Sequence, residues 1–135
     1  ILQTGKVQLF KSHRPDFKDG EQMRDFLYVK DAIRMTLHLA SHPLVGGLYN
    51  LGSGQAHTWV QLAQAIFAAL GRAPNIEFVE MPEHLKSKYQ YYTCADITKL
   101  IQSGYQQPLY PLAEAVRDYV QGYLVGDKRL GDETL

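Results

Sequence analysis

The chain has 135 residues, in which fourteen lysines and arginines balance fourteen acidic residues, with 45% hydrophobic and 21% charged residues. These values are typical of one ordinary globular domain and exclude a disordered or fibrous chain. Because the net charge is zero, the chain lacks the long-range field that would attract nucleic acid or an anionic membrane. We therefore expect a small-molecule partner, with no nucleic acid and no membrane.

The single cysteine, Cys94, excludes an internal disulfide and a cysteine-based zinc site. A lone cysteine also fits a reducing compartment. No run approaches the roughly 20 apolar residues of a membrane helix, and the first residues lack the pattern of a signal peptide. The sequence thus predicts a cytoplasmic protein.

The N-terminal elements are expected in the order helix end, strand, loop, strand, helix. Residues 1–5 read as the last turn of a helix that ends at Gly5, so the chain is expected to begin in mid-fold. A strand follows over 7–10, and residues 11–22 form a polar loop broken by proline and glycine. The aromatic and β-branched run 25–29 predicts a second strand, which leads into a helix that Asp31 could start.

The pattern of the middle segment predicts helices with strands between them. The first helix ends at His42-Pro43, and 48–51 is expected as a third strand. Thr58 and Gln61 have the spacing of a capping box, which predicts a helix that Gly71 ends. The apolar residues of the two helices recur at helical spacing; they are Val29, Ala32, Ile33, Thr36, Leu37 and Ala40 in the first, and Trp59, Leu62, Ala63, Ile66, Phe67 and Leu70 in the second.

The C-terminal part predicts a strand over 76–81 and two more helices. Asp96 can cap a short helix that runs to Gly104, and Pro111 fits the first turn of the last helix. We expect residues 1–125 to form one small mixed α/β domain. Residues 126–135 are expected to be a polar tail.

Two patterns, a glycine-rich turn and a pair of histidines, resemble binding motifs but are incomplete. The turn Gly52-Ser53-Gly54 lies between a strand and a helix, where glycine-rich loops hold phosphates, but the third glycine of a dinucleotide fingerprint is missing. His38 and His42 have the spacing of metal ligands, but no third ligand follows them. A plain tight turn and no metal site are the expectations.

Arg24 is the main candidate for a ligand-binding residue. It opens the strand over 25–29 after a loop that contains several basic residues, so a rigid element could present its guanidinium to a diphosphate. The alternative is a surface arginine paired with Asp25 or Asp31. Farther along, the run 86–92 combines two lysines with three tyrosines, which is typical of a surface that stacks on a base or sugar or of a solvated loop.

Three segments together carry a family resemblance. In order and spacing, RDFLYVKDA, GLYNLGSGQAHTWVQLAQAI and ADITKLIQSGYQQP resemble the C-terminal half of extended short-chain dehydrogenase/reductase enzymes that act on nucleotide sugars. Within that superfamily, MPEHLKSKYQYYTCADITKL is similar to the ADP-L-glycero-D-manno-heptose 6-epimerases of lipopolysaccharide core synthesis. Ser87 and Tyr92 depart mildly from that family's usual glycine and phenylalanine, and the loop over 11–22 is nearer in length to UDP-galactose-type relatives.

The resemblance implies a fold and a set of binding residues. The fold would be the small α/β substrate-binding domain of such an enzyme, with the N-terminal Rossmann domain absent. Phe10, Lys11, Ser12 and His13 would border the nucleotide sugar. Arg24 would bind its diphosphate, and Tyr89 would contact the ligand from the facing loop.

The resemblance also implies partners that these residues do not supply. The family reaction uses NADP, or NAD, and inverts one sugar carbon with the help of a Y-x-x-x-K pair, which is absent from this sequence. The chain alone is therefore expected to be inactive, to need the missing Rossmann half, and to belong to a homo-oligomer. The alternatives are a UDP-sugar 4-epimerase or a dehydratase of the same superfamily, and a non-catalytic binding or assembly module.

Overall fold

The structure, a computed structural model, describes residues 1–42 and 46–129. The chain divides into two compact units. The first unit contains Ile1–Gln22, Thr58–Tyr89 and the residues from Pro111 onward, and the second contains Met23–His57 and Gln90–Tyr110. The expected domain boundary at residue 125 stays a prediction, and residues 130–135 of the expected tail lie outside the described residues.

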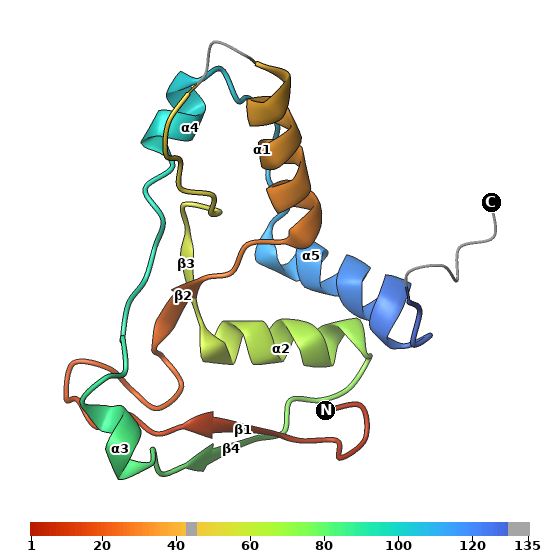
Figure 1. Cartoon of the computed structure of the whole chain (residues 1–135). Helices are drawn as coiled ribbons and strands as arrows, with labels where there is room; N and C mark the ends of the chain where they lie inside the picture. The colour runs from red at the N-terminus through yellow and green to blue at the C-terminus, as the bar shows by residue number, and fades with distance from the viewer. Residues whose placement is uncertain (43–45, 130–135) are drawn as a thin grey trace. The chain divides into compact units, whose positions relative to one another are not determined.

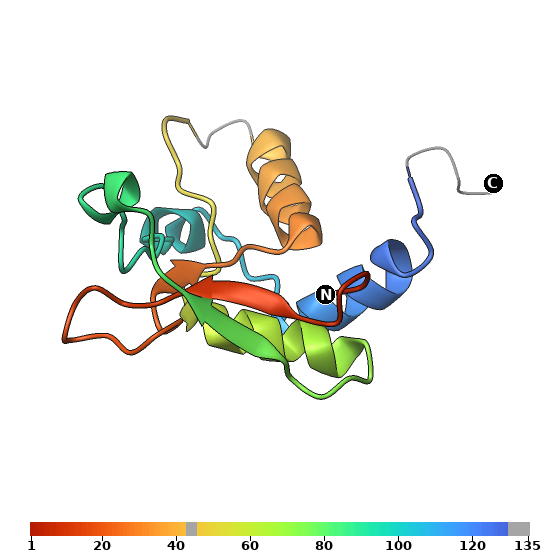
Figure 2. The same ribbon diagram turned by 90° about the horizontal axis from the view of Figure 1, so that it is seen from below.

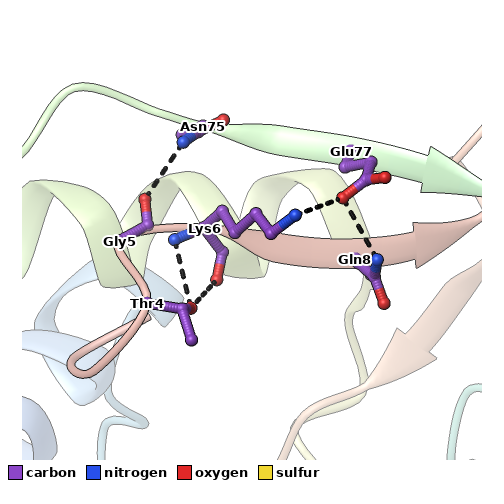
Figure 3. A network of polar contacts seen from close by, with 6 residues as sticks. All are labelled: Thr4, Gly5, Lys6, Gln8, Asn75 and Glu77. Carbon is purple, nitrogen blue, oxygen red and sulfur yellow. Dashed lines mark hydrogen bonds and ion pairs between the residues drawn. The ribbon is translucent and has the colours of Figure 1, made fainter.

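A parallel pair of strands forms the sheet of the first unit. Strand β1 (Val7–Phe10) has the predicted bounds, and it pairs with β4 (Ile76–Val79) so that Gln8 lies opposite Glu77. Glu77 accepts hydrogen bonds from Gln8 and from Lys6, at 3.1 and 2.9 Å (Figure 3). Polar side chains therefore link the two strands on the exposed face of this short pair.

Helix α2 (Trp59–Ala69) runs along the strand pair in both views of the ribbon (Figure 1, Figure 2). The predicted capping box is confirmed, since the Thr58 side chain accepts from the Gln61 amide and the Gln61 side chain accepts from Thr58. Gly71 follows the helix at a φ of 64°. Such a positive φ is easy for glycine, so this residue ends the helix as predicted.

The C-terminal helix α5 (Leu112–Tyr119) packs on α2 and continues into a π-helical turn, η1 (Val120–Leu124). Ala69, Val116 and Val120 form the buried centre of this contact. A short helix, α3 (Glu83–Lys86), follows β4 and carries an ion pair between Lys86 and Glu83. The contact between α2, α5 and η1 thus contributes a buried cluster to the core of the first unit.

The loop after β1 is closed at its base by Gly20. Its amide donates to the Phe10 carbonyl at 3.2 Å, and its φ is 72°. A Cβ atom at this position would lie 2.7 Å from the Val60 side chain and 2.8 Å from that of Phe78. Glycine is therefore required both for the backbone conformation and for the close packing.

The second unit is built around α1 (Val29–Ser41) and α4 (Thr98–Gln102), with a small sheet of β2 (Met23–Asp25) and β3 (Ala56–Thr58). Met35, Leu100 and Tyr105 form its buried core. Asp96 accepts a hydrogen bond from the Thr98 amide at 2.9 Å, but the N-cap position of α4 is Ile97 rather than the expected Asp96. The small mixed α/β architecture expected from the sequence is confirmed.

Three expectations for the second unit are wrong in detail. The strand expected over 25–29 is only Met23–Asp25, and α1 begins at Val29 rather than at Asp31. Asp31 is buried in the first turn, where it pairs with Arg34 and accepts from the Tyr110 amide. No described strand lies beside residues 48–51, so this segment is not a strand, and its Leu48 is 87% exposed.

The apolar stripe of α1 does not face the core. Val29 and Ile33 are each 52% exposed and Leu37 is 62% exposed, whereas Asp31 and Met35 on the other side are buried. Large apolar side chains at helical spacing on a surface are typical of an interface with another part of a protein.

Replacement of Gly20 by alanine should destabilise the fold by about 2–4 kcal/mol, because the left-handed backbone and the contacts with Val60 and Phe78 both oppose a Cβ atom. Urea unfolding would measure the change. The matched control is Gly71→Ala, which has a similar φ with no atom within 4 Å and should cost about 1–2 kcal/mol. Equal losses in the two variants would contradict the packing argument.

Candidate functional site

An apolar cavity of about 440 Å³ lies in the first unit between β1 and α2. Two of the predicted binding residues, Phe10 and Tyr89, lie on its wall, and their rings meet edge to face with centroids 6.1 Å apart. The other apolar residues of the lining include Val7, Leu9, Trp59, Leu62 and Ile66. The structure thus brings together two residues that are far apart in the sequence.

The chemistry of this cavity suits a flat heterocycle or another apolar group. Aromatic and aliphatic residues form most of the lining, and Gln8 is the one polar residue named among the described residues that line it. A small number of polar groups in an apolar wall is the usual composition of a small-molecule site. Sequence reasoning missed the contribution of α2, because the stripe that includes Trp59 reads as ordinary core.

The residues after Phe10 are engaged within their own loop. Lys11 forms an ion pair of 2.7 Å with Glu80, and this hydrogen bond raises the pKa of Lys11. The Ser12 amide donates to Asp19 at 2.8 Å, and His13 is exposed. A ligand phosphate at Lys11 would therefore have to compete with a carboxylate that is already there.

Gln22 is a residue of this region that the sequence did not reveal. Its side chain is almost fully buried, with 1% exposure, and its amide donates to the carbonyls of Phe10 and Lys11 at 3.4 and 3.5 Å. Both bonds are long, but they satisfy a buried polar group and hold the end of β1. A buried glutamine in a polar loop has no local signature in sequence.

Arg24 lies in the second unit, on β2, and its side chain is partly buried. Its Nη1 donates to the Met23 carbonyl at 2.7 Å. Two acidic residues were considered as alternative partners of Arg24. Asp31 accepts a hydrogen bond from Arg34, and Asp25 accepts one from the amide of Ser53. Arg24 thus lies in the middle of a strand rather than at the start of one over 25–29, and its ligand remains a prediction.

Asp25 is the most heavily hydrogen-bonded carboxylate in the described part of the chain. Its Oδ1 accepts from the amide and hydroxyl of Ser53 at 2.7 and 2.6 Å, and its Oδ2 accepts from the amides of Gly54 and Ala95, each at 3.0 Å. A Cβ atom on Gly52 would lie 2.6 Å from Oδ2 and 2.3 Å from the Ala95 side chain. The carboxylate therefore ties the end of β2 to two other segments.

These contacts set the charge state of Asp25. Burial alone would raise the pKa of the carboxyl, but the hydrogen bonds from Ser53, Ala95 and Gly54 outweigh burial and lower the pKa below its ordinary value. The group is consequently an anion at neutral pH. Its four bonds in the described residues are charge-assisted.

The glycine turn that could have held a phosphate therefore holds an anion of the protein itself. The amides of Ser53 and Gly54 point at Asp25, so the interpretation as a tight turn fits the structure better than a phosphate site. His38 contacts Ser103, and His42 contacts the His38 carbonyl. Among residues 1–42 and 46–129, no group of three or more His, Cys, Asp or Glu side chains could hold a metal ion.

Known proteins share both the sequence and the fold of this chain. Residues 2–52 match the family model described as NAD dependent epimerase/dehydratase family. The ADP-L-glycero-D-manno-heptose-6-epimerase of Nitratidesulfovibrio vulgaris is 44% identical over 124 residues, which are 92% of this chain and 38% of that protein. Over nearly its whole length, the chain is thus similar to members of the epimerase/dehydratase family.

Solved structures of epimerases share the fold of this chain. The crystal structure of ADP-L-glycero-D-manno-heptose-6-epimerase from Helicobacter pylori superposes with a TM-score of 0.71 at 26% identity, over 90% of this chain and 34% of that one. UDP-N-acetylglucosamine 4-epimerase from Methanobrevibacter ruminantium gives a TM-score of 0.75 at 20% identity, over 94% and 37%, which shows the shared fold. The chain spans well under half the length of the relatives that it matches.

None of the helices in residues 1–42 and 46–129 has the length and apolar character needed to cross a membrane.

Loss of the Asp25 charge should destabilise the protein in a pH-dependent way. At pH 7 we expect Asp25→Asn to cost about 1–3 kcal/mol, because the amide cannot accept all the bonds made by the carboxylate. A carboxyl with a lowered folded pKa stabilises the fold above its unfolded pKa of about 3.9, and this stabilisation is lost as the pH falls through the folded pKa. The difference in unfolding free energy between the two proteins should therefore shrink below about pH 4.

Chemical denaturation across the acid range would measure this difference. Asp16→Asn is the control, since Asp16 is an exposed partner of Arg14 and its loss should change stability much less. A gap between wild type and Asp25→Asn that stays constant down to low pH would contradict the role assigned to the charge.

Proposed function

We propose that this chain is the nucleotide-sugar-binding part of an NADP-dependent ADP-glycero-manno-heptose 6-epimerase that serves lipopolysaccharide core synthesis in the cytoplasm. The observation that carries the proposal is the apolar cavity bordered by Phe10 and Tyr89, in a chain that is 44% identical to a protein named for that reaction. Nucleotide-sugar recognition needs a place for the base and a place for the charges.

The cavity is the place proposed for the base and its ribose. A heterocycle buried there would exchange water for the aromatic edges of Phe10 and Tyr89 and for the aliphatic wall of α2. Lys11, Ser12 and His13 would border the same end of the ligand from the loop after β1. These residues bind and orient the ligand in this proposal and move no proton.

The diphosphate is assigned to Arg24. A planar guanidinium offers paired donors that match phosphate oxygens, and it keeps its charge at any physiological pH. Its attachment to β2, whose end is tied down through Asp25, supports this role. A charged hydrogen bond of this kind contributes about 1.5–3 kcal/mol.

The dinucleotide cofactor does not fit the residues described here. A dinucleotide requires free backbone amides in a glycine-rich turn, and the amides of the Gly52–Gly54 turn already donate to Asp25. The 135 residues also lack the Y-x-x-x-K pair. We therefore assign NADP, or NAD, and the acid/base chemistry to a Rossmann part of the enzyme, without which this chain is inactive.

The exposed stripe of α1 supports such a partner. Val29, Ile33 and Leu37 form an apolar face that the described residues leave uncovered, and the relatives are more than twice as long as the matched region. We assign this face to contact with the Rossmann part. A homo-oligomer of the whole enzyme remains part of the proposal, and a second copy on this face is the competing outcome.

The main alternative is a UDP-sugar 4-epimerase, because enzymes with that name share the fold at a TM-score of 0.75. A shared fold at 20% identity does not indicate which nucleotide the chain prefers. Two further alternatives are a dehydratase of the same superfamily and a non-catalytic binding or assembly module. Nucleotide preference and catalysis by the complete polypeptide separate these alternatives.

Calorimetry with the complete polypeptide that contains this sequence should show tighter binding of ADP and ADP-sugars than of UDP- or GDP-sugars. Arg24→Ala should weaken ADP binding roughly ten- to a hundredfold, which corresponds to the loss of one charged contact. Adenosine, which lacks phosphate, should bind the variant as it binds wild type. The KM for the nucleotide sugar should rise in parallel.

The control is Arg117→Ala, which removes an exposed arginine of α5. Its ADP affinity should match wild type. Preference for UDP-sugars would replace the heptose assignment with the 4-epimerase, and unchanged ADP affinity in Arg24→Ala would remove the assigned role of this residue.

A charge on the apolar face of α1 should disturb assembly but not folding of the chain. We expect Ile33→Glu with Leu37→Glu to leave the circular dichroism of the isolated chain unchanged, since both side chains are more than half exposed. In the complete polypeptide the same pair should lower the melting temperature and the NADP-dependent activity. Gln64→Glu, an exposed position on α2, is the control.

Ultracentrifugation of the isolated chain tests the competing occupant of this face. Self-association of the wild-type chain that the double variant abolishes, together with unaltered activity of the complete variant, would assign the face to a second copy instead.

A further inference from the structure

Strand β2 is too short to hold a side chain rigidly by pairing alone. It has three residues, and the described sheet contains only β2 and β3. Isolated two-stranded pairs are marginally stable in water. If Arg24 recognises a ligand from this strand, then another interaction must fix its backbone.

The Asp25 carboxylate supplies that interaction. It binds the Gly52–Gly54 turn through Ser53 and Gly54 and a third segment through the Ala95 amide, with all donor distances between 2.6 and 3.0 Å. The absence of space for a side chain at Gly52 shows how closely the turn approaches the carboxylate. The carboxylate is thus fixed in place from two directions.

Successive side chains of a strand point to opposite faces. Asp25 points to the turn, so Arg24, its neighbour on β2, points away from it. The strand edge is fixed as well, because the Met23 amide donates to the Tyr91 carbonyl at 2.8 Å and the Thr93 amide donates to the Met23 carbonyl at 3.3 Å. The backbone on both sides of Arg24 is therefore held.

We propose that Asp25 is a positioning residue for phosphate recognition: by anchoring β2 to the Gly52–Gly54 turn and to Ala95, it sets the direction of the Arg24 guanidinium. This inference rests on the diphosphate role proposed for Arg24. It gives the glycine turn a part in ligand binding without direct contact with the ligand. The turn binds the Asp25 carboxylate, and this contact holds β2 so that the Arg24 guanidinium faces the diphosphate of the ligand.

A double-mutant cycle in the complete polypeptide tests this coupling. Dissociation constants for ADP and for adenosine would be measured for wild type, Asp25→Asn, Arg24→Ala and the double variant. Asp25→Asn should weaken ADP binding about threefold or more and leave adenosine binding unchanged. The double variant should bind ADP no more weakly than Arg24→Ala, because the effect of Asp25 passes through the arginine.

Ser53→Ala keeps the test informative if Asp25→Asn does not fold. This change removes the hydroxyl donor to the carboxylate and leaves the other three described bonds, so ADP binding should weaken in the same direction by a smaller factor. A loss of adenosine affinity equal to the loss of ADP affinity would overturn the proposal, since it would indicate a general structural effect. Full additivity of the two single changes would also overturn it.

Failure of this inference differs from failure of the proposed function. An arginine variant that binds ADP like wild type would refute the diphosphate role and the positioning role together. A normal loss in Arg24→Ala, with unchanged ADP binding in Asp25→Asn and in Ser53→Ala, would refute the positioning role alone.

Discussion

The hydrogen-bonded carboxylate of Asp25 is the constraint on which the second unit depends. It joins the end of β2, the Gly52–Gly54 turn and the segment at Ala95, which lie 28 and 70 residues away in the sequence. The carboxylate accepts these bonds from three backbone amides and one hydroxyl. A single side chain therefore connects three segments of the second unit.

Each unit carries one of the features used in the proposal. The first unit contains an apolar cavity with two aromatic rings, and the second contains Arg24 on β2. The basic residues of the loop after β1 contribute less charge than the sequence indicates, because Lys11 and Arg14 pair with Glu80 and Asp16. A phosphate bound at Lys11 or Arg14 would therefore have to compete with these carboxylates.

The sequence predicts features whose causes are local. The bounds of β1, the capping box of Thr58 and Gln61 and the stop at Gly71 were predictable, because alternation, cap chemistry and glycine φ act within a few residues. The family resemblance predicts that Phe10 and Tyr89 each border a ligand, but neither it nor the local pattern predicts the edge contact between their rings. Residues 48–51 show the limit of such local prediction. Their composition favours a strand, but no described strand pairs with them.

Features that depend on long-range contacts were not predictable. The turn at Gly52 has the same sequence whether its amides meet a phosphate or the carboxylate of Asp25, and only the fold decides. The buried side of α1 carries Asp31 because Arg34 and Tyr110 satisfy it there, against the apolar pattern of the opposite face. Burial of Gln22 likewise depends on two carbonyls more than ten residues away.

The hydrogen bond that joins Gly20 to Phe10 has a consequence for how this fold can diversify. It closes the loop over 11–19 at its base, so residues added to or removed from the loop need not move β1 or the wall of the cavity. Lengthening a loop that is already closed costs little conformational entropy. This loop can therefore change in length and charge while the strand and cavity wall beneath it stay unchanged.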